Sequence, residues 1–102
     1  MILVMTTVSN EDVGKAFAEK IVEARLATCV QVMPRMTSVY VWDGAIQKDD
    51  EHLLLIKTLE EKYDELEKFI RENHSYEIPE IVAVRSERAA DGYLEWMTKY
   101  LR

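Results

Sequence analysis

The sequence predicts a single α+β domain of the split-βαβ kind, with one antiparallel sheet and its helices on one face. Three observations support this class. The chain has 102 residues, which is the size of one domain, so we expect residues 1–102 to fold as a unit. Apolar runs at 2–7 and 53–56 each lead into a segment with helical periodicity. Between these halves, Asp43-Gly44 is typical of the tight turn of a β-hairpin.

The first half is predicted to run from a buried strand into a helix. The segment 2–7 is apolar up to its two closing threonines, as expected for a central strand. Ser9 is the predicted N-cap of the helix, with Asp12 three residues further on. The apolar residues at helical spacing, which should be buried, are Val13, Phe17, Ile21 and Ala24.

A long hairpin is predicted at the centre of the chain. Its first strand covers 27–42 and is interrupted at Pro34, because proline cannot donate a hydrogen bond to a strand ladder. The return strand covers 45–57. At about 3.4 Å per residue the segment 27–42 would span roughly 50 Å. A domain of this length is only about 33 Å across, so we expect the tip of the hairpin to project.

The projecting part of this hairpin should be apolar on both sides. Side chains alternate along a strand, so Val39 and Val41 lie on one face and Tyr40 and Trp42 on the other. Exposed apolar patches usually mark association, and aromatic residues are enriched at interfaces. We therefore expect a subunit interface here; the alternative is that the hairpin folds back onto its own domain.

The second half repeats the strand–helix pattern and adds one helix. Thr58 is the predicted cap of the second helix, with Glu61 completing a capping box. The predicted buried stripe of that helix is Leu59, Tyr63, Leu66 and Ile70. A loop at 74–79 and a short strand at 81–84 follow, and a final helix begins at Asp91. One face of this final helix carries Tyr93, Trp96, Met97 and Tyr100. The resulting order, β-α-β-β-α-β-α, is ferredoxin-like with an extra C-terminal helix.

Composition narrows the class of function. The net charge of −6 argues against binding a nucleic-acid backbone, which requires a basic surface. No run approaches the roughly 20 apolar residues of a membrane span, so we expect no membrane association. Cys29 is the only cysteine, which excludes an internal disulfide and favours the reducing cytoplasm. Acid-before-base pairs at helical spacing, Asp64–Lys68 and Glu67–Arg71, indicate a thermostable protein.

The candidate metal ligands are few. His74 is followed by Glu77 and Glu80, and imidazole and carboxylate groups are donors for first-row divalent metals. The alternative is that His74 satisfies the last carbonyls of the preceding helix. Cys29 lies within a strand pattern, where a free cysteine behaves as a small apolar residue unless it is a ligand. Paired Cys or His spacings are absent, so a preformed zinc site is not expected.

Other groups admit a binding role or a structural one. Lys57 and Thr58 end a strand before a helix N-terminus, which could hold an anion or could simply be capped. His52 is expected to be solvated or to pair across subunits. Aromatic residues that could line a pocket are Tyr40, Trp42, Tyr76, Tyr93 and Trp96, although helix packing also explains the last two. No nucleophile–base pair, P-loop or dinucleotide fingerprint is present, so we expect neither an enzyme nor an organic cofactor.

Six segments, in order along the whole chain, resemble the CutA divalent-cation tolerance family. They are the strand 2–7, the run 24–30, Tyr40-x-Trp42-x-Gly44, the run 55–58, the stretch from His74 to Ile81, and Tyr93-Leu94-x-Trp96. The resemblance implies a ferredoxin-like homotrimer in which edge strands and hairpins pair across subunits. It also implies a link to copper and other divalent cations through His and Cys residues. His74 and Cys29 match family positions, whereas Asn73 stands where some members have a second His.

The leading expectation is therefore a cytoplasmic homotrimer associated with divalent-cation, in particular copper, binding and tolerance. His74 would hold the metal, with Glu80 or Glu77 and with Cys29 as a further candidate ligand. The expected partners are identical chains and divalent cations. The alternative is a trimeric signalling or scaffold module that resembles the nitrogen-regulatory PII proteins. In that case, clefts between subunits near Lys57, Trp42 and Tyr93 would bind a small molecule or a protein.

Overall fold

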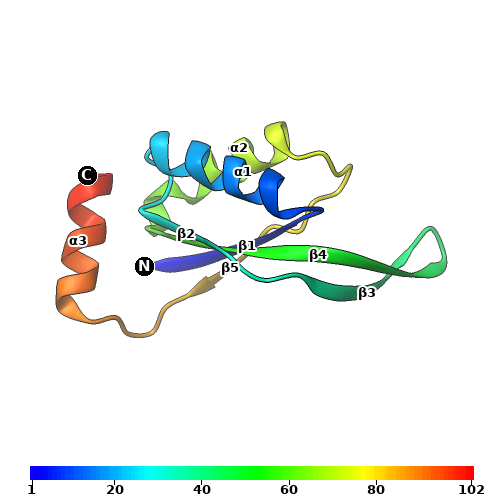
Figure 1. Ribbon diagram of the computed structural model, residues 1–102. Helices are drawn as coiled ribbons and strands as arrows, with labels where there is room; N and C mark the ends of the chain where they lie inside the picture. The colour runs from blue at the N-terminus through cyan, green and yellow to red at the C-terminus, as the bar shows by residue number, and fades with distance from the viewer.

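The computed structural model describes residues 1–102 and confirms the predicted fold class. The elements are β1 (Ile2–Val8), α1 (Glu11–Glu23), β2 (Cys29–Val32), β3 (Met36–Trp42), β4 (Ala45–Thr58), the short 3-10 helix η1 (Glu60–Lys62), α2 (Tyr63–Asn73), β5 (Val82–Arg85) and α3 (Asp91–Leu101). Helices α1 and α2 lie on one face of an antiparallel sheet, and α3 stands at one end of it (Figure 1). None of the helices has the length and apolar character needed to cross a bilayer.

Strand β4 organises the sheet. The strand order is β2-β4-β1-β5, and β3 pairs with the outer part of β4. The inner part of β4 pairs with β1 from Ile2↔Thr58 to Val8↔His52. The outer part pairs with β3 from Met36↔Glu51 to Trp42↔Ala45, and this two-stranded segment, residues 36–51, is called the arm below. The molecule measures 45 × 25 × 23 Å, and the arm projects along its long axis as predicted (Figure 1).

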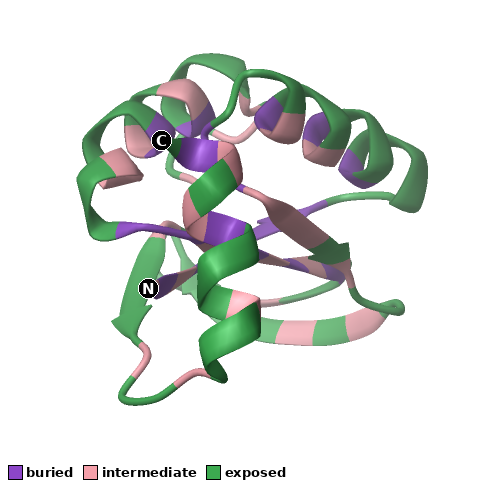
Figure 2. Ribbon diagram, turned by 90° about the vertical axis from the view of Figure 1, so that its left-hand side faces the viewer, coloured by how far each residue is buried: buried purple, intermediate pink, exposed green.

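The core lies between the helices and the inner sheet. Phe17 and Ile21 of α1 and Ile70 of α2 pack against Val4 and Ile56 in one cluster of 11 buried residues. Full burial of an aliphatic side chain of this size contributes about 1.5–3 kcal/mol. Buried residues accordingly line the helix faces that look toward the sheet (Figure 2). Three other residues, Leu59, Met97 and Leu101, form a second cluster that holds α3 against the body.

The first helix begins one residue later than predicted. Ser9 is not the cap; Asn10 is, and its side-chain oxygen accepts a hydrogen bond from the Val13 backbone N–H at 2.8 Å. Asparagine caps a helix as well as serine does. Because β1 extends to Val8, the helix begins later than predicted and Asn10 serves as its cap. Of the predicted buried stripe, Val13 and Ala24 are exposed, and Gly14 faces the sheet instead.

Thr58 does not cap the second helix either. Its hydroxyl is fully buried and donates to the Leu26 carbonyl at 2.7 Å, because β4 continues through this residue. Leu59 occupies the N-cap position of η1 without a side-chain hydrogen bond and packs against α3 instead of joining the α2 stripe. Glu61 pairs with Arg102 at 2.6 Å. Of the two predicted helical ion pairs, Glu67–Arg71 forms and Asp64–Lys68 does not.

Of the two expectations for His52, solvation and pairing across subunits, solvation is wrong. His52 is buried where the arm joins the body, and its Nδ1 lies 3.0 Å from the Met33 carbonyl oxygen. The residue belongs to β4 opposite Val8, so the edge of the body covers it.

Two buried threonines should respond oppositely to the same substitution. Thr6 Oγ1 is buried without a hydrogen-bond partner, so Thr6→Val should raise the free energy of unfolding by about 1 kcal/mol. Thr58→Val removes the donor to the Leu26 carbonyl and should lower it by about 1–3 kcal/mol. Urea denaturation of both variants measures the two changes. Destabilisation of the same size in both would contradict the assignment of their hydrogen bonds.

Candidate functional site

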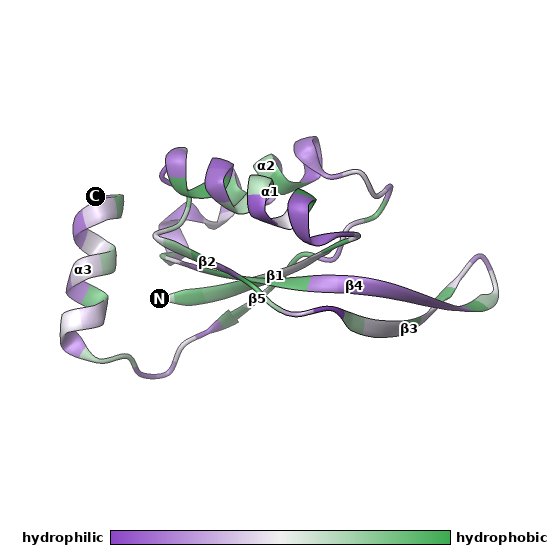
Figure 3. Cartoon of the chain, in the orientation of Figure 1, coloured by the Kyte–Doolittle hydropathy of each residue, from purple (hydrophilic) through white to green (hydrophobic).

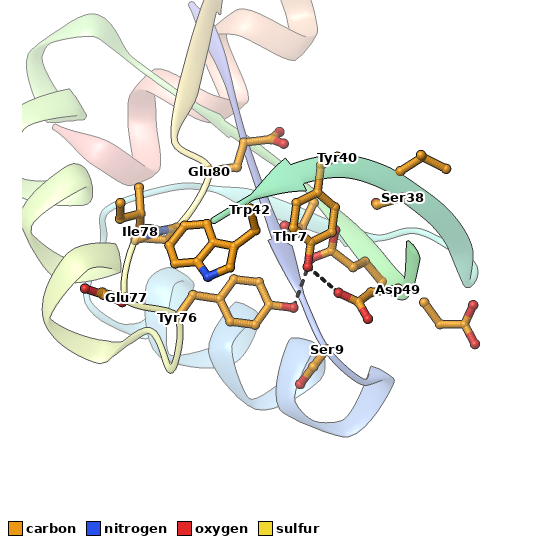
Figure 4. Close-up of a pocket in the computed structure, with 14 residues that line it drawn as sticks. Thr7, Ser9, Ser38, Tyr40, Trp42, Asp49, Tyr76, Glu77, Ile78 and Glu80 are labelled. Carbon is orange, nitrogen blue, oxygen red and sulfur yellow. Dashed lines mark hydrogen bonds between the residues drawn. The ribbon is translucent and has the colours of Figure 1, made fainter. Parts of the chain in front are cut away.

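A cleft of about 850 Å³ lies between the arm and the segment 76–80, and it is called the acidic cleft below. Three aromatic side chains line it, those of Tyr40, Trp42 and Tyr76. Five carboxylates also line it, those of Asp49, Asp50, Glu51, Glu77 and Glu80. No lysine, arginine or histidine belongs to the lining. Figure 4 shows the hydroxyl ends of Tyr40 and Tyr76 pointing into the same part of the cleft.

The pairing of β3 with β4 gives the arm two different faces. Tyr40 lies opposite Gln47 and Trp42 opposite Ala45, and this aromatic face forms a wall of the cleft. The Tyr40 hydroxyl donates to Asp49, and this bond raises the pKa of Tyr40.

On the other face of the arm, Val41 lies opposite Ile46, and the two side chains are 70% and 73% exposed. Strand alternation places the Val39 side chain on this side too, although Val39 also borders the cleft. Hydrophobic colour accordingly returns at the tip of the arm after the hydrophilic stretch of β4 (Figure 3). The arm therefore combines a cleft-lining aromatic face with an uncovered aliphatic one.

Glu51 joins the arm to the loop that forms the opposite wall. The Tyr76 hydroxyl donates to Glu51 Oε2 at 2.9 Å. Burial of the phenol is the first cause that raises the pKa of Tyr76 to about 12, and the bond to Glu51 is the second. Glu51 is itself only 8% exposed as a residue, and no basic side chain lies within ion-pair distance of it.

His74 ends α2, and both of its ring nitrogens have partners. Nδ1 accepts a hydrogen bond from the Tyr76 backbone N–H at 3.0 Å, so the proton belongs on Nε2, which donates to the Thr7 carbonyl at 2.7 Å. The ring also lies 4.6 Å from the Tyr76 ring, centroid to centroid. The imidazole thus fixes the loop to β1 rather than satisfying the last carbonyls of its own helix. A metal ion would have to replace one of these two hydrogen bonds.

The four predicted metal ligands do not lie close together within the single chain. Glu77 and Glu80 line the acidic cleft, near the loop that follows His74. Cys29 pairs with Lys57, whereas His74 contacts Thr7, which lies opposite Leu53 four residues earlier on β4. No group of three or more His, Cys, Asp or Glu side chains is placed to hold a metal ion.

The aromatic residues fall into two groups rather than one pocket. Tyr93 and Trp96 lie together on α3, with ring centroids 5.6 Å apart, at the end of the sheet away from the arm. Lys57 Nζ lies 5.5 Å from the Tyr93 ring centroid, so its charge rests on an aromatic face. The Thr58 hydroxyl is committed to the Leu26 carbonyl and is not available to an anion.

The acidic residues that β4 contributes to the cleft were not identified from the sequence. Asp49, Asp50 and Glu51 stand next to one another in β4, and a run of acidic residues usually indicates a solvated surface. The available signal was the pairing of this run with a strand that carries aromatic residues, across the predicted turn at Asp43-Gly44.

Similarity to known proteins covers nearly the whole chain. The family model described as "CutA1 divalent ion tolerance protein" matches residues 2–100. The chain is 41% identical over 101 residues to "Protein CutA, chloroplastic" of Arabidopsis thaliana, which covers 99% of this chain and 56% of that protein. It is 39% identical over 95 residues to "Divalent-cation tolerance protein CutA" of Thermus thermophilus, covering 93% and 92%. The chain thus spans little more than half the length of the plant relative.

The fold is shared with solved structures. The crystal structure of CutA1 from Oryza sativa superposes with a TM-score of 0.95 at 40% sequence identity, over 99% of this chain and 93% of that one. The long hairpin and the third helix therefore belong to the common fold and are not additions peculiar to this chain.

Tyr76 should make the protein sensitive to high pH. Since the folded state raises its pKa from 10 to about 12, the neutral phenol stabilises the fold below pH 10. This contribution should be lost as the pH rises from 10 to 12. In urea denaturation, Tyr76→Phe should therefore lose less stability than the wild type across this interval. The matched control is Tyr93→Phe, because the Tyr93 hydroxyl makes no hydrogen bond. This variant should keep the wild-type slope of stability against pH. Equal slopes for all three proteins would contradict the role of Tyr76.

Proposed function

The chain belongs to the CutA1 divalent ion tolerance family, and we propose that it acts as a homotrimer that binds divalent cations, copper among them. In this proposal it is a binding protein and not an enzyme. The observation that carries the assembly is the uncovered aliphatic face of the arm. The cation part rests on the family's name and on five carboxylates, with no basic residue, around one cleft.

Assembly would bury apolar surface that the single chain leaves in water. Val41 and Ile46 are each at least 70% exposed, although removing apolar surface from water contributes about 25 cal/mol per Å². At the other margin of the sheet, β5 pairs only with β1 and leaves its outer edge open, with Val82 and Val84 nearly half exposed. Open edges are normally paired or covered. A closed ring of identical chains satisfies both surfaces at once, because every arm finds the same neighbour.

Cation binding would begin with electrostatic attraction. The net charge of −6 and the carboxylates of the cleft favour cations near the loop 74–80. Imidazole is a suitable copper ligand, so His74 is the proposed anchor, with Glu77 or Glu80 beside it. One chain gathers no three-donor group, so a neighbouring copy would supply the remaining ligands. Cys29 lies apart from His74 and is left out of this site.

A charge on the aliphatic face of the arm should break the assembly. Wild-type protein is expected to have three times the chain mass of 11.9 kDa at micromolar concentration. Val41→Asp should shift it to a monomer, because a carboxylate would be desolvated in the interface. Val13→Asp places the same change on an exposed valine in the first turn of α1, where a negative charge is tolerated, and should remain trimeric. Light scattering after gel filtration gives the mass, and a monomeric wild type rules out the trimer.

Copper binding should depend on the His74 imidazole. His74→Gln keeps an N–H that can reach the Thr7 carbonyl but removes the ligand, so calorimetry should show copper affinity reduced by about tenfold or more. His52→Asn is the matched control, since it removes the only other imidazole and should leave affinity unchanged. Wild-type affinity should fall on acidification, because a protonated imidazole cannot bind metal. Equal affinities in the two variants would remove His74 from the site.

A further inference from the structure

The acidic cleft combines two kinds of group that attract organic cations. Trp42 and Tyr40 contribute aromatic surface that is 43% and 40% exposed, and aromatic faces attract ammonium groups. Carboxylates stand on both walls, with Asp49 on the arm and Glu77 on the loop. No basic residue belongs to the lining, and although Arg35 lies 4.0 Å from Asp50, the other four carboxylates have no basic side chain within 4 Å.

Glu51 is the carboxylate of the cleft best placed to receive a cation. The residue as a whole is only 8% exposed, and it lines the cleft. Oε2 accepts the hydrogen bond from Tyr76, Oε1 makes no hydrogen bond and stays open to the cleft, and no basic side chain lies within 4 Å. A buried carboxylate without a partner charge is costly. A cationic group that enters the cleft would supply both the donor and the charge.

The dimensions and lining favour an organic cation over a bare metal ion. A volume of about 850 Å³ is that of a site for a small organic molecule. The carboxylates are spread along the cleft, and no three of them are placed to coordinate one ion. Apolar surface from Trp42 and Ile78 lies between them, where methylene groups could pack (Figure 4).

We infer that the acidic cleft binds a linear polyamine, with one ammonium group at Glu51 and the others reaching carboxylates on the arm and the loop. Separate ammonium groups match separate carboxylates, and the methylene segments between them match Trp42 and Ile78. This inference goes beyond the proposed metal binding and does not depend on it. A polyamine is a small molecule, which is a class of ligand expected for the alternative function, a module that resembles the PII proteins.

Spermidine is the probe, and EDTA is present throughout so that metal binding plays no part. The protein carries Trp96→Phe, which leaves Trp42 as the only tryptophan and its fluorescence as the report on the cleft. We expect a saturable change in emission, one spermidine per chain by calorimetry, and weaker binding as salt is raised. Glu51→Gln keeps the acceptor for Tyr76 and should weaken binding about tenfold or more, since a hydrogen bond to a charged group is lost.

Glu19→Gln is the matched control, because it removes the same charge from an exposed position on α1 outside the cleft and should leave the affinity unchanged. Trp42→Leu, measured by calorimetry, should weaken binding about threefold or more through loss of the aromatic face. Equal affinities for Glu51→Gln and Glu19→Gln would overturn the inference. So would an emission change that sodium chloride reproduces at the same ionic strength. Because oligomer mass and copper binding are measured separately, either outcome would leave the proposed function standing.

Discussion

The structure depends on a mismatch between one strand and the body that holds it. Strand β4 has 14 residues and so extends about 44 Å, while the two shorter dimensions of the molecule are 25 and 23 Å. Only its inner half can pair with β1 and β2 beneath the helices. The outer half takes β3 as its single partner and leaves the body as a two-stranded arm. A hairpin of this kind is only marginally stable in water without a further surface to pack against.

The register of the arm places different side chains on its two faces, and these faces have different surroundings. One face places Tyr40 and Trp42 over the loop that follows α2, and the hydrogen bond from Tyr76 to Glu51 joins that loop to the arm. His74 fixes the other end of the same loop to β1 through the Thr7 carbonyl. The acidic cleft is therefore held by secondary structure on both sides. The opposite face, with Val41 and Ile46, is largely exposed in the single chain, so the surface proposed for assembly and the acidic cleft lie on different faces of the arm.

Periodicity and turn chemistry were enough to predict the element order, the break at Pro34 and the projecting tip. The predicted helix caps failed at Ser9 and Thr58, because the strands before them run further than local preference indicates. The buried environment of His52 could not be foreseen, since its ring contacts the carbonyl of Met33, a residue distant in the sequence. The acidic cleft was missed for a similar reason: Asp49 to Glu51 form a wall only once pairing sets them beside aromatic residues from β3. Local sequence indicates which residues are strand, but long-range pairing decides what they face.

The central claim is that identical chains cover the aliphatic face of the arm. Hydrogen exchange of the backbone amides in residues 39–47, followed at micromolar concentration, tests it most directly, because an uncovered hairpin frays and exchanges rapidly. We expect these amides to exchange nearly as slowly as those of β1 in the core and to lose protection on dilution together with the assembly. Rapid exchange throughout 39–47 beside a protected β1, unchanged by protein concentration, would contradict the account.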